Sequence, residues 1–215
     1  MNERLTEVVF ILDKSGSMAG LESDTIGGFN SMLEKQRKVE GEAIVSTVLF
    51  NSRFAVIHNR VNIVEVKPLT QKEYVVSGMT ALLDAVGRAI HKIRHIYAET
   101  LLEERPSKVL FIITTDGMEN SSREYSYSKL QQMIQEVKEK YNWEFLFLGA
   151  NIDAIGEAKK FGIDQEHAVQ YHSDKEGTSK NYDAINEAVI SLRMTNMIKK
   201  NWKKNIEDDF KKRKK

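Results

Sequence analysis

Five oxygen-bearing side chains in this chain combine residue types and positions that suit a metal site. Two are carboxylates that closely follow short apolar runs, and three are hydroxyls in neighbouring loops. Hard oxygen ligands without imidazole or sulfur suit Mg²⁺, Mn²⁺ or Ca²⁺ and argue against zinc or copper. The five residues are Asp13, Ser15, Ser17, Thr80 and Asp116.

These side chains can converge only if the two apolar runs are neighbouring strands of one sheet. Val8–Leu12 and Val109–Ile113 are apolar without alternation, as expected for strands that are covered on both faces. In open α/β sheets, ligands bind beyond the carboxyl ends of the strands, where the strand order reverses. The loop 77–80 leads into a predicted helix, so that Thr80 can point its hydroxyl toward the same place.

Short apolar segments alternate with longer segments of helical periodicity. This alternation predicts a doubly wound, Rossmann-like α/β fold, with a mostly parallel sheet of about six strands and helices on both faces. Strands are predicted at Glu7–Leu12, Ala43–Phe50, Val109–Thr114, Glu144–Leu148 and Ala168–Tyr171. Helical stripes are centred on Ile26–Leu33, Leu82–Tyr97, Leu130–Tyr141, Ile152–Phe161 and Tyr182–Leu192.

One connection is too short for a helix. Ala43–Phe50 is followed at once by a second strand segment, Arg53–Val66, with only Asn51 and Ser52 available for a turn. We therefore expect a hairpin, which places one antiparallel strand at an edge of the sheet.

The five residues resemble the metal-ion-dependent adhesion site of the von Willebrand factor type A (vWA) domain family. That site has Asp-x-Ser-x-Ser after the first strand, a Thr before the second helix and an Asp after the fourth strand. Every position has its match here, and the order of strands and helices agrees over roughly residues 5–198. Asp-x-Ser-x-Ser alone is a weak pattern, but Thr80 and Asp116 at the matching places make it specific.

The resemblance implies that the three hydroxyls bind the metal directly and that Asp13 and Asp116 act directly or through water. Neutral hydroxyls leave much of the charge of a divalent cation uncompensated, so the cation attracts a further oxygen. An Asp or Glu side chain of a partner protein is the best such ligand. We therefore expect a metal-dependent protein-binding module with Mg²⁺ as cofactor (Mn²⁺ or Ca²⁺ also suit it), an intracellular adaptor and not an enzyme.

Each residue taken singly also fits an ordinary structural role. Asp13–Gly16 could form a strand-to-helix turn, Thr80 could cap a helix, and Asp116-Gly117 is a common turn dipeptide. The enzymatic alternative is a metal-dependent phosphohydrolase of the haloacid dehalogenase type, which resembles this chain in the Asp after a central strand. Such an enzyme needs a second Asp two residues later, where this chain has Ser15.

Two further polar segments are interpreted as solvent-exposed. His91 and His95 have the spacing of metallohydrolase ligands, but no Glu follows the first, and they share a helix face with Asp84 and Arg88. We interpret this face as solvated. The polar segment His172–Asn181 is predicted to be a surface loop before the last helix.

The composition excludes several classes of protein. Apolar residues make up 41% and charged residues 29%, as in globular domains. The longest runs of strong hydrophobes have five residues, whereas a membrane span needs about 20, and no secretory signal follows Met1. The chain has no cysteine, which excludes disulfides and zinc–thiolate sites and favours the cytoplasm. The oligomeric state is left open.

The two ends of the chain differ in charge. Residues 199–215 carry nine Lys or Arg against three acidic residues, a net charge of +6, which leaves residues 1–198 at −5. We therefore divide the chain into a vWA-like domain, 1–198, and a basic tail, 199–215, in which the last helix continues past residue 198. Its apolar stripe, Ile198, Trp202, Ile206 and Phe210, is expected to pack on the domain. The alternative is a free basic arm that binds nucleic acid or an anionic surface, but the acidic body makes nucleic acid unlikely.

Overall fold

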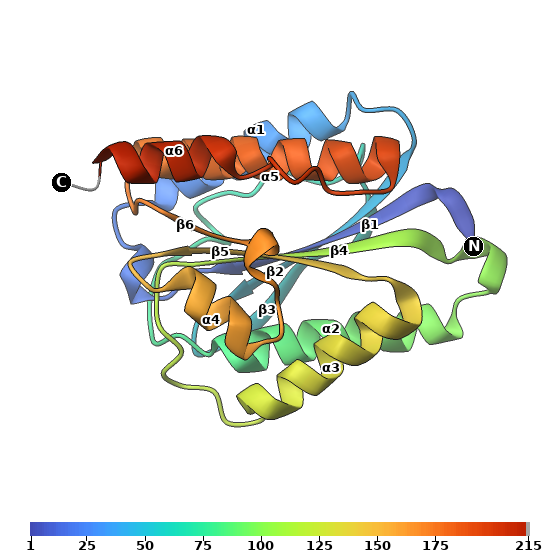
Figure 1. Ribbon diagram of the computed structural model, residues 1–215, viewed down its shortest axis with the longest axis horizontal. Helices are drawn as coiled ribbons and strands as arrows, with labels where there is room; N and C mark the ends of the chain where they lie inside the picture. The colour runs from blue at the N-terminus through green and yellow to red at the C-terminus, as the bar shows by residue number, and fades with distance from the viewer. Residues whose placement is uncertain (214–215) are drawn as a thin grey trace.

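A computed structural model describes residues 1–213 as a six-stranded sheet between two layers of helices (Figure 1). The strand order is β3-β2-β1-β4-β5-β6, and every pairing is parallel except that of β2 with β3. This confirms the predicted fold class, including the antiparallel edge strand. The strands are β1 (Asn2–Asp13), β2 (Glu42–Phe50), β3 (Phe54–Asn62), β4 (Pro106–Thr115), β5 (Glu144–Ala150) and β6 (Ala168–Tyr171).

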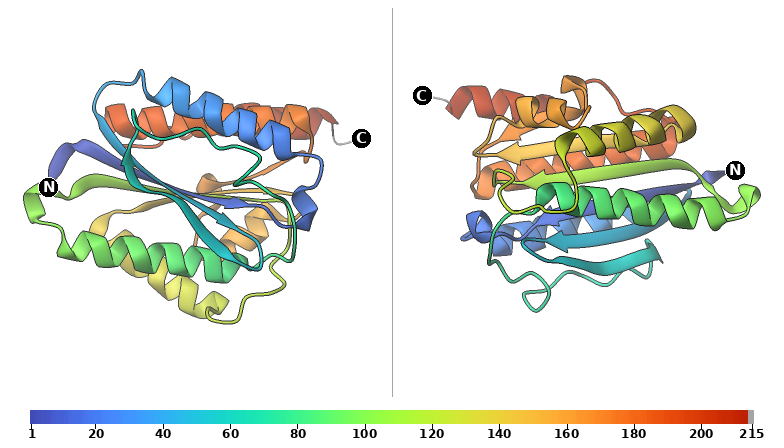
Figure 2. Two further views of the ribbon diagram at one scale, coloured as in Figure 1. Left: turned by 180° about the vertical axis from the view of Figure 1, so that it is seen from behind. Right: turned by 90° about the horizontal axis from the view of Figure 1, so that it is seen from below.

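The helices form one layer on each face of the sheet. One layer contains α1 (Glu22–Gln36), α5 (Lys175–Thr195) and α6 (Lys204–Arg213). The opposite layer contains α2 (Leu82–Glu99), α3 (Tyr127–Tyr141) and α4 (Ala154–Lys160) (Figures 1 and 2). Short 3₁₀ turns lie at Gly16–Met18, Leu102–Glu104 and Gln165–His167.

The central strands supply both hydrophobic cores. Val8 and Phe10 of β1 belong to the core beneath α1 and α5, whereas Val9 and Ile11 belong to the core beneath α2 and α3. Each fully buried aliphatic or aromatic side chain contributes about 1.5–3 kcal/mol through loss of water-exposed apolar area. Burial on both faces explains why these strands lack polar alternation.

The connection from β3 to α2 runs back to the carboxyl edge of the sheet without a helix (Figure 2). β3 ends at Asn62, earlier than predicted, yet Val66, Leu69 and Tyr74 of the connection are buried in the core on the α1 side. The Tyr74 hydroxyl donates a hydrogen bond to the backbone carbonyl of Asp13. The connection therefore fixes the end of β1.

Two predictions about the last helices are wrong. The segment His172–Asn181 is not a loop throughout, because α5 begins at Lys175, with the Asp174 side chain accepting a hydrogen bond from the Gly177 amide at 2.8 Å. The helix also does not continue past residue 198. It ends at Thr195, and Asn196 adopts the left-handed conformation (φ 60°) that terminates helices.

The polar face predicted for α2 is only partly solvated. His91 and His95 are exposed, as predicted. Asp84 is buried, and its carboxylate accepts hydrogen bonds of 2.9–3.0 Å from the backbone amides of residues 123–125. Asp84 thus stabilises the loop after β4, a role that its place on the stripe did not reveal.

The basic segment packs on the domain within the described residues. Trp202 and Ile206 are buried in the core on the α5 side, which confirms the packing predicted for the apolar stripe. Lys214 and Lys215 of the predicted tail lie outside the described residues. No helix within residues 1–213 is long and apolar enough to cross a membrane.

Candidate metal centre

The candidate site lies where the order of the strands reverses. β1 has β2 on one side and β4 on the other, so the chain winds outward in both directions from the β1–β4 pair. Asp13 ends β1, and Asp116 follows the last residue of β4. The two aspartates therefore stand at the carboxyl edge of neighbouring strands, as the sequence predicted.

Three hydroxyl groups meet beside this edge. The Thr80 hydroxyl donates to Ser15 Oγ at 2.9 Å, and Ser15 Oγ lies 3.0 Å from Ser17 Oγ. A Cβ placed on Gly117 would lie 2.7 Å from Thr80 Oγ1, 2.8 Å from Ser17 Oγ and 3.5 Å from Ser15 Oγ. The three oxygens thus surround one small space, which stays open only because residue 117 is glycine.

Asp13 is a buried carboxylate held by neutral donors. Its side chain accepts a hydrogen bond from the Ser15 amide at 2.7 Å and another from the Thr115 hydroxyl at 2.6 Å. Burial raises the pKa of Asp13 to about 6; the hydrogen bonds from Thr115 and Ser15 lower it, and the nearby charge of Asp116 raises it further. A cation at this edge would stabilise the ionised form.

Asp116 has one oxygen engaged and one without a partner. Its Oδ2 accepts a hydrogen bond from the Ser173 hydroxyl at 3.0 Å. Its Oδ1 is buried with no hydrogen-bond partner within the described chain. A buried acceptor without a partner costs about 1–3 kcal/mol, and more when it is charged, so this oxygen is a natural position for a ligand.

Backbone contacts join the loops that carry these side chains. The Gly16 amide donates to the carbonyl of Gly78 at 2.9 Å, which links the loop after β1 to the loop before α2. Asn120 accepts a hydrogen bond from the Thr80 amide through Oδ1 and donates its own amide to the Thr80 carbonyl, at 2.9 and 3.0 Å. The hydroxyl positions are therefore preorganised.

The donor set fits a hard divalent cation. Two carboxylates and three hydroxyls converge from three loops, and all of them are oxygen ligands of the kind that Mg²⁺, Mn²⁺ and Ca²⁺ prefer. Within residues 1–213 no cluster of three or more His, Cys, Asp or Glu side chains is suited to hold a metal ion. Among residues 1–213 the oxygen-rich edge between β1 and β4 is the candidate metal centre.

Sequence reasoning missed three residues of this edge. Thr115 binds Asp13, Gly117 leaves the space among the hydroxyls, and Ser173 binds Asp116. Ser173 follows the end of β6, and the rule that ligands gather beyond the carboxyl ends of parallel strands could have identified it. It was overlooked because its segment was interpreted as a surface loop.

Comparisons of the sequence and of the structure with known proteins gave different results. No protein-family model matches the sequence, and no curated protein matches it either. The fold has many counterparts among solved structures.

Three of these structures illustrate the similarity. The vWF domain of the type V pili tip protein Mfa5 from Porphyromonas gingivalis is 10% identical, with a TM-score of 0.60 over 86% of this chain and 94% of that one. Proximal thread matrix protein 1 from the mussel byssus, with a zinc-occupied MIDAS motif, is 16% identical, with a TM-score of 0.59 over 86% of this chain and 46% of that one. The ArnB paralog VWA2 from Sulfolobus acidocaldarius is 16% identical, with a TM-score of 0.53 over 87% and 45%.

These similarities establish the vWA fold for this chain. The chain spans less than half the length of the mussel and Sulfolobus proteins and nearly all of the Mfa5 domain. The vWA fold therefore extends over 86–87% of this chain.

Proposed function

We propose that this chain is a divalent-cation-dependent protein-binding module that engages an Asp or Glu side chain of a partner protein. The observation that carries the proposal is the space at the carboxyl edge of β1 and β4, where three hydroxyl oxygens converge beside Gly117. The partnerless Oδ1 of Asp116, a residue that follows β4 at the same edge of the sheet, is a second oxygen source. We assign Asp13, Ser15, Ser17, Thr80 and Asp116 to the cation.

The residues of the site supply both neutral and negatively charged oxygen atoms. Ser15, Ser17 and Thr80 present hydroxyls that contribute no negative charge, and the two aspartates supply the only carboxylates. When bound, a divalent cation supplies a Lewis-acidic centre whose remaining charge favours a carboxylate from outside the chain. Thr115 and Ser173 keep the aspartates oriented through their hydroxyls.

We further propose that the module is not catalytic and acts in the cytoplasm. Both oxygens of Asp13 accept hydrogen bonds, which disfavours its use as the nucleophile of a phosphohydrolase. Ser15 stands where such an enzyme needs its second Asp, and its hydroxyl contacts the hydroxyls of Thr80 and Ser17. The absence of cysteine from the sequence supports a reducing compartment.

The identity of the cation is the first property to test. We propose that the cation in the cell is Mg²⁺ and that Mn²⁺ or Ca²⁺ can replace it. Zn²⁺ should be tested as well, because the motif of the mussel protein is occupied by zinc. Isothermal titration of the wild-type chain with each cation should give a single site. Ser17→Ala and Asp116→Asn should each weaken binding at least tenfold, whereas Ser128→Ala, an exposed serine on α3, should leave it unchanged. Equal binding by all four proteins would overturn the assignment.

The second test concerns the carboxylate of the partner. Proteins retained on the immobilised chain in Mn²⁺ and released by chelator are identified, and their exposed Asp and Glu residues are changed to Asn and Gln. We expect one such change to abolish retention. Retention that is insensitive to chelator, or to every carboxylate substitution, would contradict the proposed mode of binding.

A further inference from the structure

A serine from a distant strand reaches the candidate metal centre. Ser173 lies in the short loop between β6 and α5, and β6 is separated from β4 by β5. Its hydroxyl donates to Asp116 Oδ2 at 3.0 Å. With one oxygen of Asp116 held in this way, the orientation of the other, partnerless oxygen is also fixed.

The end of α6 contacts the residues on both sides of Ser173. The His172 ring stacks on the Phe210 ring with centroids 4.6 Å apart, and His172 Nε2 lies 3.3 Å from the Phe210 carbonyl oxygen. On the other side, the Arg213 guanidinium forms an ion pair with Asp174. Both neighbours of Ser173 in the sequence therefore contact α6.

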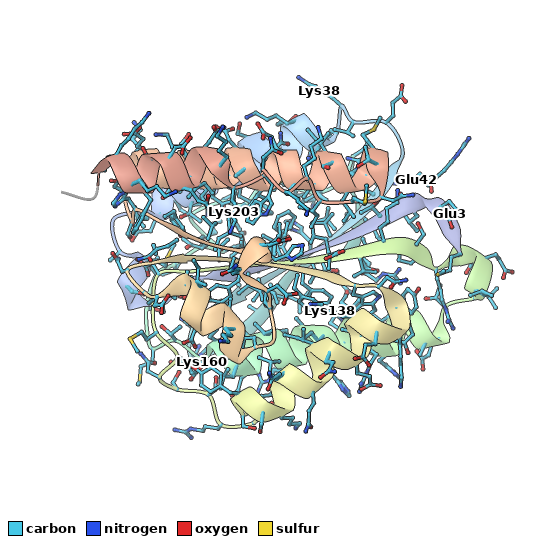
Figure 3. The ribbon with its side chains drawn as sticks, viewed as in Figure 1. Glu3, Lys38, Glu42, Lys138, Lys160 and Lys203 are labelled. Atoms are coloured by element: carbon cyan, nitrogen blue, oxygen red, sulfur yellow. The ribbon has the colours of Figure 1, made fainter. Side chains whose placement is uncertain are left out.

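The beginning of α6 is anchored independently. Trp202 Nε1 donates to the Glu166 carbonyl at 3.0 Å. Lys203, which Figure 3 labels, donates through Nζ to the carbonyls of Gln165 and Ala168 at 2.6 and 2.9 Å. These contacts lie before and at the start of β6, whereas those of Phe210 and Arg213 lie after it. The segment 202–213 thus spans β6 from one end to the other.

An ionic network fixes the end of α6 against α5. Asp209 is 8% exposed as a side chain and contacts both Lys180 of α5 and Arg213. Arg213 joins the same network to Asp174, the residue that caps α5. Release of Arg213 would therefore loosen the loop and the first turn of α5 together.

We propose that Ser173 is a positioning residue of the metal centre and that α6 sets its position. The packing of α6 holds residues 172–174 in place. The hydrogen bond from the Ser173 hydroxyl then fixes the orientation of the Asp116 carboxylate. The effect on cation affinity rests on the proposed function, whereas the mechanical coupling between α6 and Asp116 does not. A partner or a modification that displaces α6 would weaken the hold on the cation.

The test compares Mn²⁺ affinities by isothermal titration of the full chain. Ser173→Ala should raise the dissociation constant about tenfold, as is usual when the residue that orients a ligand is removed. Ser173→Thr, which keeps the hydroxyl, should restore wild-type affinity. The double substitution Phe210→Ala/Arg213→Ala, which frees the loop from α6, should raise the constant severalfold. Lys211→Ala, an exposed residue of the same helical turn, is the matched control and should have no effect.

Combination of the variants decides whether α6 acts through Ser173. The triple variant combines Ser173→Ala with Phe210→Ala/Arg213→Ala. It should bind Mn²⁺ no more weakly than Ser173→Ala alone, because the substitutions in α6 act only through the contact of Ser173 with Asp116. Losses that multiply would overturn the proposal, as would a wild-type dissociation constant in Ser173→Ala.

A metal-free measurement separates this proposal from the proposed function. In chelator, amide NMR resonances of residues 115–117 should shift in the same direction in Ser173→Ala and in Phe210→Ala/Arg213→Ala. If the wild type binds no Mn²⁺, the proposed function fails, and these shifts still decide the coupling. Unchanged resonances in the Phe210→Ala/Arg213→Ala variant would overturn it.

Discussion

Two buried carboxylates of β1, one near its middle and one at its end, are compensated in different ways. Glu7, in the first half of the strand, is 0% exposed and lies 3.1 Å from Arg60 Nε of β3. The N–H of Arg60 is not aimed for a hydrogen bond, so the contact is an ion pair. Asp13, at the end of the strand, is 1% exposed and is held by an amide and a hydroxyl.

Burial raises the pKa of both groups, of Glu7 to about 7 and of Asp13 to about 6. In Glu7 the positive charge of Arg60 opposes this effect, whereas in Asp13 hydrogen bonds from neutral groups oppose it. Within residues 1–213 no ion pair of this chain involves Asp13 or Asp116. The domain thus compensates Glu7 with a cation of its own, whereas Asp13 has no cationic partner among the described residues. In the proposed function, an external cation takes that place.

Removal of the internal cation should have the largest effect. Arg60→Met leaves Glu7 buried without a counter-ion, and we expect the free energy of unfolding to fall by about 4 kcal/mol at pH 8. At pH 5 the loss should shrink, because Glu7 is then protonated. Urea unfolding at both values of pH measures this. Arg53→Met, on the exposed hairpin turn, is the control, with an expected change below about 0.5 kcal/mol. An equal loss at both pH values would show that Arg60 acts by packing.

Substitution of Glu7 should change the pH dependence of stability. Because its pKa in the folded chain, about 7, is above the ordinary value of 4.5, the folded state binds the proton more tightly. The resulting stabilisation is complete below pH 4.5 and is lost as the pH rises through 7, a total of about 3 kcal/mol. Glu7→Gln should remain stable over this range and so gain about 3 kcal/mol relative to the wild type between pH 4.5 and 8. Parallel stability curves for the two proteins would contradict the assignment.

Neutralisation of the other carboxylate should remove the response to metal. In Mn²⁺ at about 100 times the dissociation constant, the wild type should gain about 2.7 kcal/mol of stability over the protein in chelator. Asp13→Asn should gain nothing, and Glu7→Gln should gain as much as the wild type. Thermal unfolding in chelator and in Mn²⁺ measures all three. If Asp13→Asn gained as much stability in Mn²⁺ as the wild type, Asp13 would not differ from Glu7 in its need for an external cation.

A methyl group in the space among the hydroxyls should have the smallest effect on stability. Gly117→Ala places a Cβ within 2.8 Å of Thr80 Oγ1 and Ser17 Oγ, both of which can move, so we expect a loss of about 1 kcal/mol in chelator. The Mn²⁺ response should disappear. Gly27→Ala on α1 is the matched control, because nothing lies within 4 Å of its Cβ, and it should keep the response. Retention of the response in Gly117→Ala would place the cation elsewhere.

The arrangement of the sheet could be predicted because its signals are local. The unbroken apolar runs before Asp13 and Asp116 indicated two central strands, and the two-residue turn at Asn51 indicated the hairpin. Neighbouring strands then brought the two aspartates together without any knowledge of their side chains. The hydroxyls followed from the resemblance, and the structure places Ser15, Ser17 and Thr80 in mutual contact.

The contacts that hold the site depend on tertiary packing, and most of them are not visible in the local sequence. Asp84 was placed with solvated residues, yet it binds the loop after β4. The polar segment before Asn181 was expected to be a loop, because it has no apolar stripe. In the structure its helical residues contact α6 through charged groups, as in the ion pair of Lys180 with Asp209. The cap at Asp174, followed by Lys175 and Glu176, is the signal that could have located the start of α5.

The same anchoring of α6 has a consequence for the solubility of the domain. β6 is the last strand of a parallel sheet, and an uncovered edge strand is a template for pairing with another molecule. Trp202 and Lys203 bind backbone carbonyls just before and at the start of this strand, and the helix that follows packs beside it. We therefore expect that chains cleaved before Trp202 expose this edge strand and associate through it, which sedimentation would measure.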